Sequence, residues 1–421
     1  MDGVDRALDA ADAVADLREP AVQGLKYLKQ VWRLLEPLAG VGAERDLAGN
    51  RKLKFNQYAS LILLSMFDPA LRSVHRLCDA SALKRVRKKI GGSGRVSVGS
   101  FSESARVFDP QYLEPIITEL IAALPQGHPG PGPGRNIPET IPEELAKKLT
   151  AVDGSALRAL PRIVAAAGAA QNSGKWRLHL QFEVFRGTPA GVAFTPDEVK
   201  GDGEREVLER SLRAGRVYVG DRGYERYQLY EAIVQAGSDY VIRGQSRPVE
   251  ILEERPLSAE ARQARVISDE TVRLGQSRGV GAVTHPVRRI VLEGRGAGRV
   301  RTDRSNADHI ILMTSLTDVP AEVVAAIYEL RWSIELFFRF LKHLLGCGHL
   351  LSHKDEGVAI QVYCALIACL LLAQVTGGNV GTRALNMIQL YLSGWADEEE
   401  VLEALSRIHA SEEARRRNRS R

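Results

Sequence analysis

Apolar positions recur at helical spacing in the first third of the chain and change to strand spacing after it. Between residues 22 and 124, stretches such as YASLILLSMF and YLEPIITELIAAL place apolar residues three and four positions apart, which predicts helices. The stretch PQGHPGPGPGRNIP follows, and its proline and glycine content cannot hold a regular element. We therefore predict a helical N-terminal domain over residues 1–125 and a linker over residues 126–145.

Short apolar runs and strict alternation after the linker predict a sheet. LTAVDGS is expected to form a short strand that ends at Asp153, and WRLHLQFEV alternates without error between apolar and polar residues. RVYVGDRGY predicts another short strand, with Asp221 immediately past its end. A helical stretch, YQLYEAIVQAG, and a further strand, DYVIRG, come next. Strands followed by a strand–helix–strand unit indicate an α/β fold.

The segment from about residue 245 to 308 is rich in arginine, glycine and valine and interrupts this pattern. Its candidate strands are RQARVIS, VRRIVLEG and GRVRTD, so we predict a mainly β insertion there. HIILMTSL then returns to the main sheet. One helix is predicted from near Asp318 to Gly346, with Pro320 in its first turn, and a more apolar helix from Val358 to Val375.

The composition is that of an ordinary soluble globular protein. Of 421 residues, 44% are hydrophobic and 26% are charged. The long apolar helix is interrupted by Gln361 and Gln374, which favours a core helix over a membrane span. The four cysteines show no CxxC pairing, and the N-terminus lacks the basic-then-apolar order of a signal peptide, so we expect a cytoplasmic protein without a membrane partner.

Charge is distributed unevenly along the chain, although the net charge is only +5. The first stretch is acidic, whereas LKRVRKKIGGSGR and the C-terminal tail are basic. Such clusters are compatible with nucleic acid, and a solvated surface is the alternative. In the first basic stretch, the residues that we expect to contact DNA are Lys84, Arg85, Arg87 and Lys88.

The stretch YELRWSIELFFRFLK carries a narrow polar stripe beside an apolar face. At about 100° per residue, the polar side chains fall within about 60° of one another on a helix. These polar residues are Tyr328, Arg331, Glu335 and Lys342. The apolar residues beside them are Ile327, Leu330, Ile334, Phe337, Phe338, Leu341 and Leu344. Taken alone, the stripe indicates an ion pair between Arg331 and Glu335, four residues apart.

Two further acids change this interpretation. Asp153 and Asp221 each end a predicted strand, where side chains project into a crevice at the sheet edge; a cap or Asx turn is the alternative, because a glycine closely follows each. With the acid of the stripe they form three carboxylates, which suit a pair of Mg²⁺ ions. Two such ions about 4 Å apart can drive phosphodiester displacement. Arg331 and Lys342 would then hold phosphates, and Tyr328 would donate to a phosphate oxygen.

VDGS, VGDRGY and YELRWSIELFFRFLK resemble the three catalytic motifs of bacterial insertion-sequence transposases of the IS-four (Tn-five-like) DDE family. The last stretch matches that family's signature of Tyr, Arg, Glu and Lys at spacings of three, four and seven residues. The resemblance covers roughly Leu149–Val375. It implies an RNase H-like catalytic core over residues 146–375, with the β-rich insertion at about 245–308, and a helical C-terminal segment with a basic tail over residues 376–421.

The resemblance also implies roles for individual residues. The ligands of two Mg²⁺ ions, for which Mn²⁺ can substitute, would be Asp153, Asp221 and Glu335. The contacts to DNA ends would be Tyr328, Arg331, Lys342 and Arg243. The implied reaction is nicking at terminal inverted repeats followed by transfer of the 3′-hydroxyl into target DNA, by a homodimer on paired ends of double-stranded DNA.

One departure from the family and two other functions stay open at this point. Several relatives that form hairpin ends stack a flipped base on an aromatic residue of the insertion, but residues 245–309 contain no Trp, Tyr or Phe, which leaves Trp332 and Trp176 as candidates. The first alternative function is a domesticated nuclease or a DNA-binding protein with a vestigial site. The second is a helical DNA-binding regulator whose acids are caps and ion pairs, which predicts no dependence on Mg²⁺.

Overall fold

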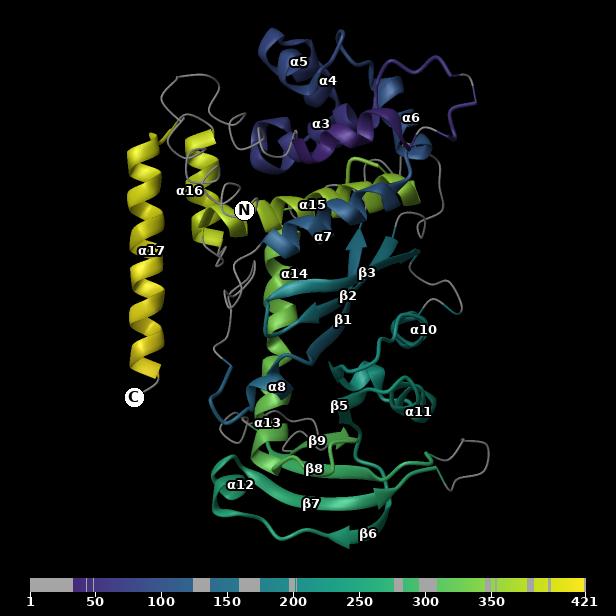
Figure 1. Ribbon diagram of the computed structural model, residues 1–421, viewed down its shortest axis with the longest axis vertical. Coiled ribbons are helices and arrows are strands. Elements are labelled where there is room, and N and C mark those ends of the chain that lie inside the picture. The colour runs from purple at the N-terminus through teal and green to yellow at the C-terminus, as the bar shows by residue number, and fades with distance from the viewer. Residues whose placement is uncertain are drawn as a thin grey trace, which may run out of the picture.

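A computed structural model describes residues 33–419, except 43, 48, 124–136, 159–174, 197–200, 202, 276–282, 295–308, 345–349, 353, 377–381 and 393–394. This part of the chain is a mixed α/β fold around one sheet of strand order β3-β2-β1-β4-β5-β9-β8-β7-β6 (Figure 1). The strands are β1 (Leu149–Arg158), β2 (Lys175–Glu183), β3 (Thr188–Pro196), β4 (Val217–Gly220), β5 (Asp239–Gly244), β6 (Glu250–Glu254), β7 (Val266–Arg273), β8 (Val287–Glu293) and β9 (His309–Thr314).

Three parallel strands form the centre of the sheet. β1 pairs with β4 and β4 with β5 in parallel, whereas all other neighbours are antiparallel. The chain between β3 and β4 includes α10 (Glu204–Arg210), and the chain between β4 and β5 includes α11 (Tyr227–Gln235). Parallel strands need such crossovers, because a tight hairpin can join only antiparallel strands. The predicted α/β class is confirmed.

β1 extends further than its sequence predicted. It was expected to end at Asp153, but it continues to Arg158 because β2 pairs with it along its whole length, from Thr150 opposite Glu183 to Arg158 opposite Lys175. The pairing of β1 with β4, by contrast, runs only from Leu149 to Ala151. Asp153 therefore lies just past the end of the parallel pairing, although it is in the middle of a strand.

The β-rich insertion is not a separate sheet. β8 pairs with β9 from Arg288 opposite Thr314 to Glu293 opposite His309, so β8, β7 and β6 extend the main sheet. Part of the predicted strand RQARVIS forms the short helix α12 (Ala259–Gln263), because Ser258 caps it by accepting a hydrogen bond from the backbone of Ala261 at 2.9 Å. The predicted strand GRVRTD falls outside the described residues.

The helix predicted from Asp318 to Gly346 is two helices. α13 (Ala321–Leu330) and α14 (Trp332–Leu344) are separated at Arg331. The backbone N–H of Arg331 donates to the carbonyl of Tyr328, and that of Ile334 donates to the carbonyl of Arg331, which are the three-residue spacings of a tighter turn. The expected apolar face is buried: Ile327, Leu330, Ile334, Phe337, Phe338 and Leu341 are at most 5% exposed.

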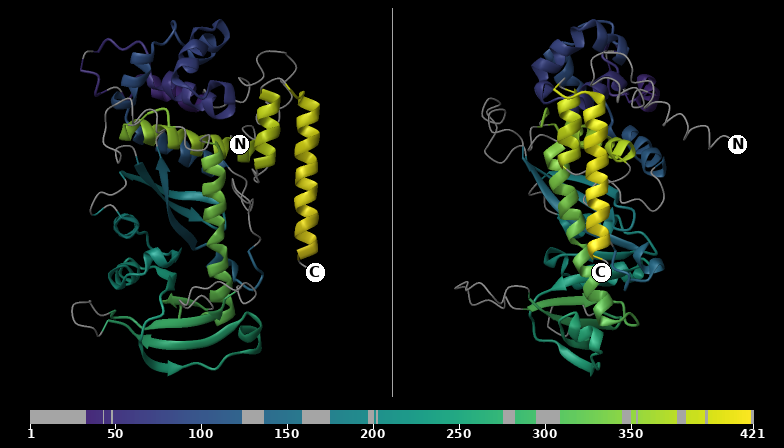
Figure 2. Two further views of the ribbon diagram at one scale, coloured as in Figure 1. Left: turned by 180° about the vertical axis from the view of Figure 1, so that it is seen from behind. Right: turned by 90° about the vertical axis from the view of Figure 1, so that its left-hand side faces the viewer.

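Helices lie on both sides of the central strands and across one end of the sheet (Figure 1). α14 runs beside β1, α15 crosses above the strands with α7 alongside it, and α3 to α6 lie beyond α15 (Figures 1 and 2). The N-terminal helices are α3 (Phe55–Phe67), α4 (Val74–Ala82), α5 (Lys84–Ile90), α6 (Val98–Val107) and α7 (Glu114–Ala123). α8 (Glu143–Ala146) precedes β1, and the C-terminal helices are α15 (Asp355–Thr376), α16 (Thr382–Leu392) and α17 (Glu398–Arg419).

α15 is the central helix of the core. Its side chains from Val358 to Ala373 are nearly all buried, and they pack against α3, α6, α7 and α14. One helical stretch among the described residues, Asp355–Ala373, is long and apolar enough to cross a membrane, and 94% of it is buried inside the protein. The N-terminal helices and the sheet therefore share one hydrophobic core through α15. The division into domains at residues 126–145 stays a prediction.

Candidate active site

Three polar residues form a row across the parallel strands. β1 and β4 pair Ala151 with Val219, so two residues further on Asp153 comes alongside Asp221. β4 and β5 pair Gly220 with Ile242, so the next position brings Arg243 beside Asp221. Residues aligned in this way point to the same face of a sheet. The face is the one covered by α13 and α14, because Ala151, Val219 and their neighbours pack there.

Asp153 is partly buried beside other acids. Burial raises its pKa to about 6; the backbone N–H of Gly154, which donates at 2.8 Å, acts against this, while the nearby charge of Asp221 adds to it. Asp221 also forms a cap, which was the alternative role that its sequence left open. Its Oδ1 accepts a hydrogen bond from the backbone N–H of Gly223 at 2.7 Å and caps the short turn Arg222–Tyr224. This bond leaves its second oxygen for other partners.

Arg331 links the row to the helices. Its Nη2 donates to Oε1 of Glu335 at 2.5 Å, and its guanidinium lies 5.8 Å from the centre of the Tyr328 ring. Arg331 also interacts electrostatically with Asp153. Burial raises the pKa of Tyr328, and the charges of Arg331 and Arg243 lower it, so the phenol stays protonated at neutral pH. The structure thus brings Tyr328 and Arg331 close to the row of strand residues, with Glu335 hydrogen-bonded to Arg331.

The other predicted DNA contacts lie further away or elsewhere. Lys342 is half-buried on α14, two turns beyond Glu335. The basic helix α5 lies beyond α15, away from the acids (Figures 1 and 2). On it, Lys84, Arg85 and Lys88 are exposed and Arg87 is partly buried. Trp332 is 38% exposed beside Arg339, and the side chain of Trp176 is outside the described part.

The donor atoms suit a hard divalent cation, but their arrangement does not yet form a cage. Asp153, Asp221 and Glu335 offer only carboxylate oxygens, the ligands that Mg²⁺ prefers. Among the residues that the structure describes, no three His, Cys, Asp or Glu side chains are placed to hold a metal ion. The carboxylate of Glu335 is instead hydrogen-bonded to Arg331.

A fourth acid, Glu204, was missed by the sequence reasoning. It begins α10, accepts a hydrogen bond from Arg177 of β2, and interacts electrostatically with Asp153. Its own segment, GDGEREVLER, reads as an ordinary charged helix. The signal that was available is the glycine after each motif aspartate, Gly154 and Gly223, because both leave room for this side chain.

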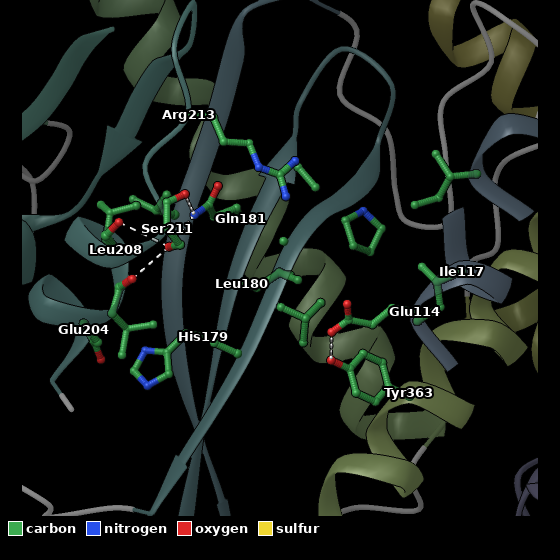
Figure 3. Close-up of a pocket in the computed structure, with 18 of the residues that line it drawn as sticks. Glu114, Ile117, His179, Leu180, Gln181, Glu204, Leu208, Ser211, Arg213 and Tyr363 are labelled. Carbon is green, nitrogen blue, oxygen red and sulfur yellow. Dashed lines mark hydrogen bonds between the residues drawn. The ribbon is translucent and has the colours of Figure 1, made fainter. Parts of the chain in front are cut away.

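A cavity of about 260 Å³ adjoins the site from the α10 side. Figure 3 shows Glu204, His179 and Gln181 on one side of it and Glu114 on the other. Gln181 donates to Ser211 Oγ at 2.8 Å, and Tyr363 donates to Glu114 at 2.6 Å. The polar residues of β2 are thus buried against α10, although the alternation of β2 placed them opposite its apolar face. The cavity lining does not include the three predicted metal ligands.

Comparison with known proteins identifies relatives among transposases. Residues 144–371 match the model of the transposase DDE domain family. A putative transposase, y4zB, of Sinorhizobium fredii (strain NBRC 101917 / NGR234) is 34% identical over 164 residues, which cover 38% of this chain and 43% of that protein. The transposase for insertion sequence element IS421 of Escherichia coli is 28% identical over 263 residues, which cover 54% and 66%. The chain thus matches between about two fifths and two thirds of these relatives' lengths.

Among solved structures, a piggyBac transposase synaptic complex with hairpin DNA aligns over 92% of this chain and 85% of that chain, at a TM-score of 0.42 and 10% sequence identity. A score this low does not establish a shared fold. The family model, by contrast, covers more than half of the 421 residues and includes the strand row, α10, α13 and α14. The chain belongs to the transposase DDE domain family.

Proposed function

We propose that the chain is a DNA transposase of an insertion sequence, which cuts at terminal inverted repeats and transfers 3′-hydroxyl ends into target DNA by cut-and-paste. One observation carries the proposal: Asp153 and Asp221 lie side by side where the parallel pairing ends, and Arg331, which is hydrogen-bonded to Glu335, interacts with Asp153 from the helices. This arrangement lies within the residues that match the family model.

We further propose that β3-β2-β1-β4-β5, with α10, α11, α13 and α14, is an RNase H-like core of the kind that the IS-four resemblance implies. Three parallel central strands flanked by an antiparallel hairpin support it. In this proposal residues 1–125 form a DNA-binding domain, residues 146–375 the catalytic domain, and residues 376–421 a C-terminal segment. The β-rich insertion then lies between the second aspartate and the glutamate.

The side chains of the site have separate tasks in the proposed reaction. Asp153, Asp221 and Glu335 would hold divalent cations, Mg²⁺ with Mn²⁺ as a substitute; two ions when bound would activate the attacking hydroxyl and stabilise the leaving oxygen. Arg331 orients Glu335 before the cation arrives. Arg243 continues the row on β5, where its guanidinium would pair with a backbone phosphate.

Double-stranded DNA is the proposed partner, both as transposon ends and as target. Lys342, Tyr328 and Arg331 would contact the cut end, whereas the exposed basic residues of α5 would contact DNA at the other side of α15. Two such surfaces on one chain fit a homodimer that pairs two ends, each protomer binding DNA at both surfaces. The protein would act in the cytoplasm, on the nucleoid.

The test is strand cleavage of DNA that carries the inverted repeats flanking the gene, with Mg²⁺ or Mn²⁺. The parent chain should nick at the repeat boundary and Asp153→Asn should not. Asp79→Asn is the matched control, because Asp79 is an exposed acid on α4 that pairs with Arg95. Equal cleavage by the parent and Asp153→Asn would overturn the proposal, and specific DNA binding without metal-dependent cleavage would favour the regulator.

A further inference from the structure

Two motif glycines leave room for Glu204 beside the proposed metal ligands. A Cβ on Gly154 would lie 2.5 Å from Oε1 of Glu204. A Cβ on Gly223 would lie 3.4 Å from Oε2 of Glu204 and 2.9 Å from Oδ1 of Asp221. The Glu204 carboxylate thus spans from the backbone just after Asp153 to the turn just after Asp221. Oxygens of two different acids border the same small space above Gly223.

The position of Glu204 is fixed by two neighbouring arginines. Arg177 Nη1 donates a hydrogen bond to Oε1 of Glu204, which leaves Oε2 on the side of Gly223. The next residue of α10, Arg205, donates from Nε to the carbonyl oxygen of Gly223 at 2.5 Å. α10 is therefore attached both to β2 and to the turn that follows β4. The glutamate side chain is only 21% exposed, so its location is well defined by packing.

Glu204 approaches the acids from behind the sheet. Along β1, Ala151 packs on the side of α14, and Val152 packs on the side of α10 and α11. Because successive side chains of a strand alternate, Asp153 faces α13 and α14, and Gly154 faces α10. Because β4 ends at Gly220, no strand separates Glu204 from the space past the end of β4. Glu204 thus lies beside the proposed metal ligands, but it approaches them from the opposite side of the sheet.

We propose that Glu204, held by Arg177, is a positioning residue that raises the affinity of the Asp153–Asp221 site for a divalent cation. The inference rests on the proposed function, since it concerns the same site. Mg²⁺ keeps several of its waters when it binds protein carboxylates. An additional carboxylate beside the ligands accepts hydrogen bonds from such waters and adds negative charge, and residues in this position tune metal affinity.

The test measures metal affinity in two ways in the full chain. Glu204→Gln keeps the size of the side chain and an oxygen for Arg177, but removes the charge. We expect the Mg²⁺ concentration for half-maximal cleavage, and the Mn²⁺ concentration for half-maximal thermal stabilisation without DNA, to rise about 10- to 100-fold. Cleavage at saturating metal should approach that of the parent. Glu204→Asp keeps the charge and should recover part of the affinity, and it serves if the glutamine variant does not fold.

The matched control is Glu206→Gln, on the same helix, where the glutamate pairs with Arg226 instead. Its two metal midpoints should equal those of the parent. Parent-like midpoints in Glu204→Gln, or lower cleavage with unchanged midpoints, would overturn the inference. Asp153→Asn distinguishes a failure of the proposed function from a failure of this inference alone. If that variant still binds Mn²⁺ and cleaves, the proposed function fails; if it loses both while Glu204→Gln resembles the parent, only this inference fails.

Discussion

Arg331 donates a 2.5 Å hydrogen bond to Glu335 one turn further along the chain, and their side chains are only 16% and 27% exposed. Burial opposes the charge of Arg331, yet Tyr328 and Glu335 hold the pKa of the guanidinium above its ordinary value. Arg331 therefore stays charged at any working pH. In the proposed function, a cation that binds Glu335 would release Arg331 for the phosphates of a DNA end, and this pair would then link metal binding to DNA binding.

Arg331→Lys should weaken cleavage far more than it weakens folding. Lysine is a point charge without the planar fork of arginine, so it does not orient the Glu335 carboxylate in the same way. We expect cleavage to fall about 10- to 100-fold, as for other residues that orient metal ligands. Because lysine keeps the positive charge beside Glu335, the free energy of unfolding should change by only about 1 kcal/mol, the net contribution of a typical hydrogen bond. Cleavage rates and urea unfolding measure the two effects.

Arg407→Lys is the control for this prediction. Arg407 pairs with Glu403 at the same four-residue spacing on α17, at 2.8 Å and with both side chains exposed. Its substitution should leave cleavage and stability unchanged. If Arg331→Lys cleaved as well as Arg407→Lys, the pair with Glu335 would have no part in the reaction.

Asp153 should make the metal-free protein less stable as the pH rises from about 4 to about 6. Its pKa is raised from 3.8 to about 6, mainly by burial, so the folded protein keeps a proton that the unfolded chain has already lost. Stability falls with pH wherever the folded state binds more protons, by up to about 3 kcal/mol for a shift of this size. Above pH 6 this loss is complete.

The measurement is urea unfolding of the parent and of Asp153→Asn in EDTA across pH 4–7. Other titrating groups affect both proteins, so the difference between them isolates Asp153. The parent should lose stability relative to the asparagine variant as the pH rises. A difference that stayed constant, or that changed in the opposite direction, would contradict the assignment of this pKa.

Removing charge from α5 should weaken DNA binding in proportion to the number of charges. Lys84, Arg85 and Lys88 are exposed on this helix. Each phosphate contact that is lost should reduce the slope of log affinity against log salt concentration by about 1. Fluorescence anisotropy with end DNA at several salt concentrations measures this slope for single and combined glutamine variants.

The control for α5 is Arg95→Gln, a nearby exposed arginine whose charge is paired with Asp79 at 2.7 Å. We expect it to leave the salt slope unchanged. If the α5 variants kept the affinity and slope of the parent, the basic helix would be a solvated surface, which was the alternative that its sequence left open.

Local sequence patterns predicted elements well where one chain segment determines them. The alternation of WRLHLQFEV and the apolar face of α14 depend only on side-chain period: β2 formed as expected, and the apolar face is buried although the predicted helix is divided in two. The extension of β1 to Arg158 depends on β2, and the break at Arg331 depends on how α13 and α14 pack on the sheet. Such tertiary effects do not appear in a single stretch of sequence.

The candidate site likewise combines residues that the sequence indicates with one residue that only the tertiary structure brings there. Asp153, Asp221 and Glu335 belong to motifs, so the sequence indicated them, although their roles stay predictions. Glu204 comes to the site only because α10 packs across the end of β4, and nothing in its own segment indicates this. The joining of the insertion to the main sheet was missed for the same reason, since it depends on the pairing of β8 with β9.

Arg288 joins this insertion to the loop before α13, and its loss should destabilise the protein strongly. Its Nε and Nη2 donate to both oxygens of Asp269 at 2.7 and 2.6 Å, and its Nη1 donates to the carbonyls of Leu316, at 3.1 Å, and Val319, just before α13. The two charged side chains are 4% and 5% exposed. Arg288→Met leaves Asp269 buried without its partner, which should lower the free energy of unfolding by about 3–5 kcal/mol.

Replacing both partners distinguishes two contributions to stability: the cost of a buried carboxylate without a partner and the cost of losing the hydrogen bonds to the loop. Arg288→Met with Asp269→Leu removes the uncompensated carboxylate and should recover much of the stability, except for about 1–3 kcal/mol from the loop carbonyls left without a donor. Arg273→Met is the control, because that arginine pairs with Glu250 on the surface of the insertion. Urea unfolding measures all three. If Arg288→Met cost no more than Arg273→Met, the insertion would not depend on this pair, and α13 would need another anchor.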